Sequence, residues 1–176
     1  MSAAAAPFSH SYNLGRLGQA GDEVRLAPGE AERAAIARLA DLPAVPRFAA
    51  TVTLTRTSPT RFRLDYRLEA EVVQACVVTL APVTGAIARD FTRELHFIGA
   101  GHRAPAADLE LSSGDEEEPE EIESLHYDLA GPALEEFLLG LDPYPRAPGA
   151  QFSPAPEAGE APESPFAVLK SLKSRT

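Results

Sequence analysis

The stretch that decides the fold is FAATVTLTRT, residues 48–57, together with its continuation TRFRLDYRLEAEV, residues 60–72. In both runs apolar residues alternate with polar ones, which is the period of a half-buried β-strand. The polar positions are mostly threonines in the first run and arginines and acids in the second. Because a short Ser-Pro turn joins the runs at residues 57–60, the pattern predicts a long antiparallel hairpin with one apolar face.

Two helices and a third strand are predicted around this hairpin. Residues 27–42 have a proline and two acids at the start of a helical pattern, and residues 132–141 carry an apolar stripe at helical spacing. Residues 87–98 read as a strand that Arg89 and Arg93 interrupt, which is typical of a sheet edge. Shorter strands are expected within residues 7–17 and 122–129. Together these elements predict an α+β fold: a twisted antiparallel sheet, able to close partly, with two helices packed on it.

The charge pattern divides the chain into a body, an insert and a tail. Residues 108–123 contain nine acidic residues and no basic one, out of a formal net charge of −10 for the whole chain. A run of like charge with Gly and Pro cannot bury a core, so we expect a mobile loop at about residues 103–121. We therefore predict a single domain over residues 7–150, followed by a Pro-rich linker and a short basic segment over residues 151–176.

Composition excludes several classes of function. One cysteine in 176 residues cannot form an internal disulfide or a four-thiolate zinc site, which favours a reducing cytosol. The opening residues lack the basic region of a secretory signal, and no run approaches the roughly 18 apolar residues of a membrane span. Neither a phosphate-binding glycine loop nor a metal-ligand spacing is present, so no cofactor, metal or small-molecule substrate is predicted.

The lone cysteine, Cys76, lies in the apolar run EVVQACVVTLAPVTG, residues 71–85. As a nucleophile it would need a thiolate and a positioned base such as histidine, and none of the four histidines stands in a suitable sequence context. Burial among valines and leucines would raise the pKa of the thiol. A buried structural thiol is therefore the favoured interpretation over a catalytic one.

Basic side chains offer the candidate contact surface. Arg61, Arg63 and Arg67 project from one side of a single predicted strand, with Arg56 across the turn, and could meet phosphates or acidic groups. The alternative is a solubilising face on which the arginines pair with the neighbouring acids of the same strand. The basic end adds three further candidates, which are Lys170, Lys173 and Arg175.

The order of three sequence pieces resembles the YceD family, the large ribosomal RNA subunit accumulation proteins, and within it the alphaproteobacterial members. The pieces are CVVTLAPV at residues 76–83, DPYPRAPGA at residues 142–150, and SPFAVLKSLK at residues 164–173. In the wider family a second cysteine stands three residues after the first, where this chain has Thr79. A zinc or redox role suggested for such members is therefore not carried over. The positions that match the family motifs or mark this departure are Cys76, Thr79, Leu80, Pro82, Asp142, Pro143, Tyr144 and Pro145.

The resemblance implies a role in the accumulation of large-subunit ribosomal RNA. The leading hypothesis is a non-enzymatic assembly factor of the bacterial cytoplasm that binds a ribosomal protein, a pre-ribosomal particle or rRNA. Direct weak RNA binding without a stable protein partner is the first alternative, and a cysteine-dependent enzyme is the second. On the resemblance, Cys76 marks the place where a strand ends in a turn and performs no chemistry.

Overall fold

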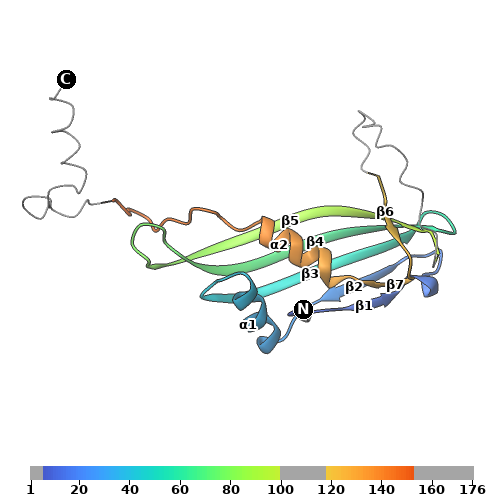
Figure 1. Ribbon diagram of the computed structural model, residues 1–176, viewed down its shortest axis with the longest axis horizontal. Helices are drawn as coiled ribbons and strands as arrows, with labels where there is room; N and C mark the ends of the chain where they lie inside the picture. Colours follow the sequence, from blue (N-terminus) through green and yellow to red (C-terminus); the bar gives the residue numbers. More distant parts are fainter. Residues whose placement is uncertain (1–5, 100–117, 153–176) are drawn as a thin grey trace, which may run out of the picture.

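The computed structural model of the protein describes residues 6–99 and 118–152. This part of the chain forms a five-stranded sheet in the order β2-β3-β4-β5-β6, a two-stranded sheet of β1 and β7, and two α-helices (Figure 1). The strands are β1 (Ser11–Asn13), β2 (Asp22–Leu26), β3 (Ala44–Arg56), β4 (Arg61–Ala75), β5 (Pro82–Phe97), β6 (Glu120–Ile122) and β7 (His126–Asp128). The helices are α1 (Glu30–Leu39), α2 (Ala130–Leu139) and a short 3-10 helix at Leu14–Arg16.

The predicted hairpin is confirmed as β3 and β4. The two strands pair antiparallel, with Leu54 opposite Leu64 and Val52 opposite Tyr66. Every second residue of β4 from Phe62 to Val72 is buried, so the alternation read from the sequence corresponds to a core face and an outer face. A register shift between Ala44 and Arg47 interrupts the ladder near the start of β3.

Strand β5 extends the hairpin into a three-stranded meander. It pairs with β4 over all but its last residue, from Ala75 opposite Pro82 to Arg61 opposite His96. On its other side only the parallel strand β6 follows, and it covers Leu95 to Phe97. Among the described strands β5 therefore forms the sheet edge over most of its length, as the two interrupting arginines predicted. One of them, Arg93, reaches Glu135 of α2 at 3.1 Å.

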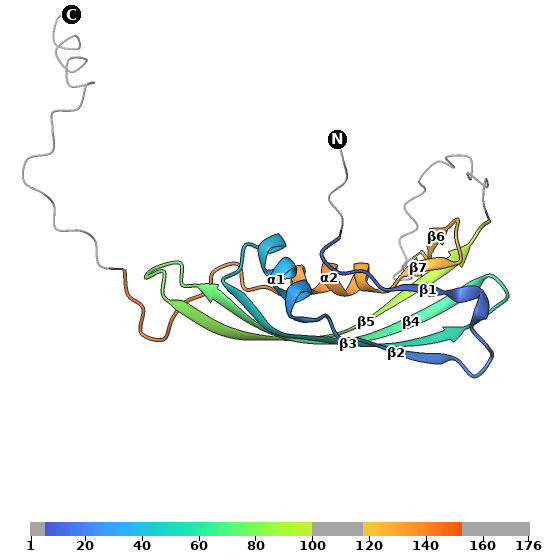
Figure 2. The ribbon, with the colours of Figure 1, turned by 90° about the horizontal axis from the view of Figure 1, so that it is seen from below.

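All the covering elements lie on one face of the five-stranded sheet. Figure 2 shows α1, α2 and the β1-β7 pair on the same side, and no described element covers the opposite side. The predicted α+β class with two packed helices is confirmed. The sheet does not form a closed barrel, because its edge strands β2 and β6 do not pair with each other.

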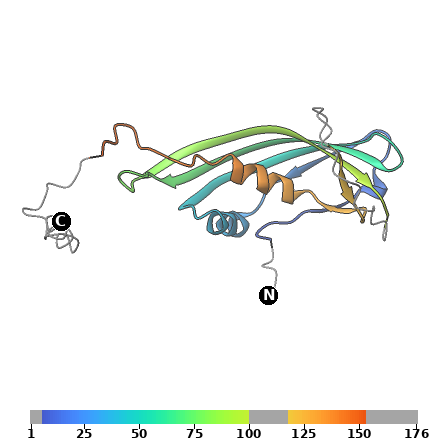
Figure 3. The same ribbon diagram turned by 45° about the horizontal axis from the view of Figure 1, so that its top comes forward.

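Helix α2 is anchored to the sheet by an aromatic side chain and by a glycine. The ring of Phe137 is fully buried and lies 5.4 Å from the ring of Phe48 on β3. At the end of the helix, a Cβ on Gly140 would approach Ile87 of β5 to 2.8 Å, so only glycine permits this packing distance. The path of α2 across the meander is visible in Figure 3.

Within residues 6–99 and 118–152, one buried side-chain polar atom lacks a hydrogen-bond partner, the hydroxyl of Tyr66. This side chain is 2% exposed and its ring stacks on Phe91 at 4.5 Å, while its oxygen makes no hydrogen bond. Because a buried hydroxyl without a partner loses its hydration, Tyr66→Phe should raise the free energy of unfolding by about 1 kcal/mol. Chemical denaturation of the two proteins measures the difference, and a destabilised variant would show that the hydroxyl is hydrogen-bonded in solution.

Candidate functional site

The uncovered side of the sheet is the candidate site, and we call it the outer face. It is formed by the odd-numbered residues of β3 and β4 and by the residues of β2 and β5 paired with them. Its charged groups are balanced, with five arginines against six carboxylates. They are Arg25, Arg47, Arg61, Arg63 and Arg67, and Glu23, Asp65, Glu69, Glu71, Asp90 and Glu94.

Ion pairs neutralise most of the arginines that the sequence singled out on this face. The Arg63 guanidinium lies 3.1 Å from Asp65, and Arg67 donates to Asp90 at 3.2 Å from the neighbouring strand. All four side chains are exposed. Exposed pairs of this kind contribute only about 0–1 kcal/mol, so the partners can exchange for groups on another molecule at little cost.

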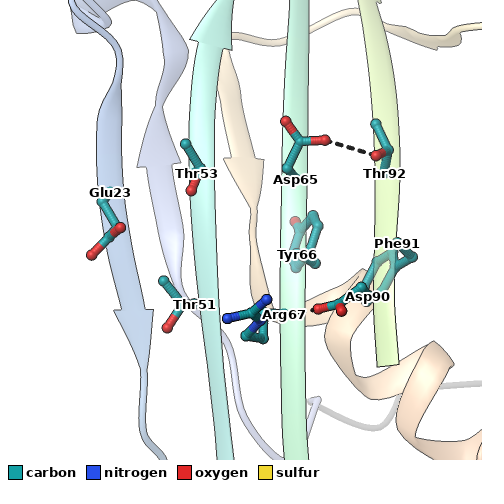
Figure 4. Close-up of a pocket in the computed structure, with 9 residues that line it drawn as sticks. All are labelled: Glu23, Thr51, Thr53, Asp65, Tyr66, Arg67, Asp90, Phe91 and Thr92. Carbon is teal, nitrogen blue, oxygen red and sulfur yellow. Dashed lines mark hydrogen bonds and ion pairs between the residues drawn. The ribbon is translucent and has the colours of Figure 1, made fainter. Parts of the chain in front are cut away.

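A shallow hollow of about 500 Å³ lies at the centre of the outer face (Figure 4). Three of its four charged groups, all except Glu23, already have partners, because Asp65 accepts a hydrogen bond from Thr92 at 2.7 Å and Asp90 accepts one from Arg67. The hollow is therefore suited to contact and recognition more than to proton transfer. Its lining residues are Glu23, Thr51, Thr53, Asp65, Tyr66, Arg67, Asp90, Phe91 and Thr92.

Not all the predicted contact residues lie together. Arg61, Arg63 and Arg67 share the outer face. Arg56 instead lies opposite Phe62 in the β3-β4 ladder, at a core-face position. The Arg56 guanidinium stacks over the Phe62 ring at 5.4 Å from its centroid and donates to a carbonyl of the hairpin turn. The candidates Lys170, Lys173 and Arg175 lie outside the described residues.

A second cluster forms where two of the motif pieces meet, and we call it the hairpin end. It comprises the turn between β4 and β5, residues 76–81, and the segment after α2, residues 142–147. The N–H of Val77 donates to the carbonyl of Pro145 at 2.9 Å, and the side chain of Gln74 donates to the carbonyl of Asp142 at 2.8 Å. Two pieces far apart in sequence are thus joined by hydrogen bonds into one surface.

Cys76 is the fully buried centre of this cluster. Its sulfur accepts hydrogen bonds from the N–H groups of Ala147, at 3.3 Å, and Val78, at 3.4 Å. These donors and the Thr79 side chain favour the thiolate, and the Ala147 N–H is the largest contribution. They lower the pKa of the thiol to about 6 against the opposing effect of burial. The expectation of a raised pKa was therefore wrong, because apolar neighbours in the sequence do not reveal backbone donors.

The hairpin end does not assemble catalytic or metal-binding chemistry in the described part of the chain. His96 lies opposite Arg61 in the β4-β5 ladder, at the other end of β4 from Cys76. At the rise per residue of a strand, the two ends are roughly 45 Å apart. His126 lies in β7, and His10 directly precedes β1. Within the two described ranges, no group of three or more His, Cys, Asp or Glu side chains could hold a metal. One thiol beside a threonine hydroxyl does not fit the thiolate ligand sets of structural zinc.

Comparison with known proteins gives one match. A family described as "Large ribosomal RNA subunit accumulation protein YceD" matches residues 64–173, which is more than half of the chain. The match begins in β4 and includes both parts of the hairpin end. No curated protein and no solved structure matches the chain. No helix in the described ranges is long and apolar enough to span a bilayer.

Proposed function

The chain belongs to the YceD family, and from this premise we propose that it is a non-enzymatic factor supporting the accumulation of large-subunit ribosomal RNA. In this proposal it binds a ribosomal protein or a pre-ribosomal particle through the outer face. The family description supplies the role in large-subunit rRNA accumulation, and the choice of partner is ours. The proposal places the chain in the bacterial cytoplasm, where ribosomes are assembled.

The observation that carries the proposal is the uncovered outer face with its balanced charges. An antiparallel sheet can leave one face to water, and here that face presents paired guanidinium and carboxylate groups in place of a purely basic patch. A phosphate backbone reaching Arg63 or Arg67 would also meet Asp65 or Asp90. Since nucleic-acid affinity depends on unopposed positive charge, the pairing favours a protein surface as the main partner over bare RNA.

Net charge supports a basic partner. The whole chain carries −10, and much of that charge falls within residues 108–123. A field of this sign attracts positively charged molecules and accelerates their encounter, whereas it slows the approach of a polyanion. Ribosomal proteins are basic, so they meet this condition. The exposed ion pairs of the outer face can then re-pair with the partner's own charges.

Affinity capture tests the proposal. Tagged full-length chain, incubated at mild salt with lysate of growing cells, should retain ribosomal protein or large-subunit precursor, and the protein should persist after ribonuclease treatment. The Cys76→Ala variant should capture the same material, since the proposal assigns the thiol no chemistry. Retention of RNA alone, lost steeply between low and moderate salt, would support the direct RNA-binding alternative instead. Retention of neither protein nor RNA would contradict both hypotheses.

A further inference from the structure

The hairpin end exposes apolar side chains that do nothing for the fold. Leu80 is 79% exposed and Tyr144 72% exposed, and they lie on the two segments that hydrogen bonds join. Val77 is also exposed, at 48%. The fifteen residues from Gln74 to Ala88 include no charged side chain, so the turn contributes an uncharged apolar surface, and the facing segment adds the exposed Asp142 and Arg146.

The backbone of Leu80 is also strained. Its φ of +60° is the left-handed conformation, which costs an L-residue other than Gly, Asn or Asp roughly 1 kcal/mol or more. Glycine or asparagine would occupy this turn position with less strain and would not expose a leucine to water. Strain and apolar exposure at one residue, without a folding benefit, point to binding.

The surface is also held rigidly in place. The turn is closed by hydrogen bonds from the N–H of Cys76 to Ala81 and from the N–H of Leu80 to Cys76, at 2.8 and 2.9 Å. The bonds from Val77 and Ala147 then fix residues 142–147 against it. Because the apolar groups are presented in one arrangement, an occupant need not order them on binding.

We propose that the hairpin end is the docking site of the chain's own C-terminal segment, residues 165–172, PFAVLKSL. This segment has one charged residue, Lys170, and supplies apolar residues of its own, with Phe166, Leu169 and Leu172 recurring at every third residue. The family match continues through residue 173, so this segment and the turn at Cys76 belong to the same family pattern. The proposal is independent of the ribosomal partner.

Chain length permits this contact. The described residues end at Phe152, five residues after Ala147, whose N–H bonds to Cys76. The residues between Phe152 and Pro165 reach about 40 Å when extended, and a coil of that length averages about 20 Å. A tether of this kind gives an effective concentration near millimolar, so a contact too weak to form between separate molecules forms within the chain.

Tryptophan fluorescence of the full-length chain tests the docking. The sequence has no tryptophan, so Tyr144→Trp introduces a single reporter at the hairpin end. Adding Phe166→Ser with Leu169→Ser should increase quenching of the reporter by acrylamide at least about twofold. At a millimolar effective concentration, a contact with a millimolar dissociation constant is formed half of the time, and it shields the reporter during that time. The matched control Lys170→Ser with Lys173→Ser keeps the apolar residues and should leave quenching unchanged.

A second substitution shows whether the two sites interact. Leu80→Asp in the reporter background should increase quenching as the tail substitutions do, and combining both changes should add nothing further. Equal quenching in the reporter and in the tail variant would overturn the proposal. Protection that rises with protein concentration would also overturn it, because the occupant would then be a second copy of the chain.

Discussion

Replacing Phe137 with alanine is expected to lower the free energy of unfolding by about 3–5 kcal/mol. The ring is fully buried between α2 and the sheet and contacts the ring of Phe48. Its removal deletes the apolar contacts that attach α2 to β3 and leaves a cavity that the rigid strands cannot fill. Since domains are stable by only about 5–15 kcal/mol, this single change removes a large part of the total.

Urea denaturation followed by circular dichroism measures this loss. Leu139→Ala is the matched control, because Leu139 lies on the same helix and is 73% exposed. The control should change the free energy of unfolding by no more than about 0.5 kcal/mol. A loss for Phe137→Ala as small as that of the control would mean that α2 does not pack on the sheet.

The central hairpin was predictable because its signal is local. Alternation over residues 48–55 and 61–71 fixes strand type and core face together, and both are confirmed in β3 and β4. Helix α2 was located correctly, yet Leu138 in its predicted apolar stripe is 38% exposed. The buried positions are Ala130, Pro132, Ala133, Leu134 and Phe137, because the small alanines fit where the helix approaches the sheet closely.

Strand β2 was missed, although a short signal existed. Val24 and Leu26 alternate with Glu23 and Arg25 directly after Gly21, which has a φ of +76°. Five residues are too few to separate a strand from a loop by period alone. Pairing with β3 decides the outcome, since Val24 lies opposite Val52 and Leu26 becomes fully buried.

The candidate surfaces needed the three-dimensional structure for a similar reason. Arg67 and Asp90 are 23 residues apart, and only the β4-β5 register places them together. Ala147 and Cys76 are separated by 71 residues, so nothing local in the sequence announces the hydrogen bond to the sulfur. The sequence showed which residue types were available, and the register showed which charges neutralise one another.

Reversing the charge of three outer-face arginines is expected to abolish most of the ribosomal association. The triple variant Arg61→Glu, Arg63→Glu and Arg67→Glu places new carboxylates beside Asp65 and Asp90. The outer face then carries many more carboxylates than arginines. The loss comes from local pairing, because the partner carboxylates that replace Asp65 and Asp90 beside the arginines would be repelled at contact distance, even though the partner as a whole is basic. A difference of about 1.4 kcal/mol corresponds to tenfold in affinity, so three reversals should reduce binding at least about tenfold.

A charge-matched control separates this surface from a general effect of net charge. Arg16→Glu, Arg33→Glu and Arg38→Glu change the total charge equally, but lie on the 3-10 helix and α1, on the covered side of the sheet. This control should bind like the wild type. Equal loss in both triple variants would assign the effect to net charge and exclude the outer face as the contact surface.

Gradient sedimentation of cell lysates tests the central claim most directly, because it asks whether the outer face holds the chain on ribosomal material. The wild-type chain and the α1-side control should sediment with large-subunit precursors at mild salt, and the outer-face triple variant should remain at the top of the gradient while still folded. Co-sedimentation of that variant at the wild-type level would contradict the account.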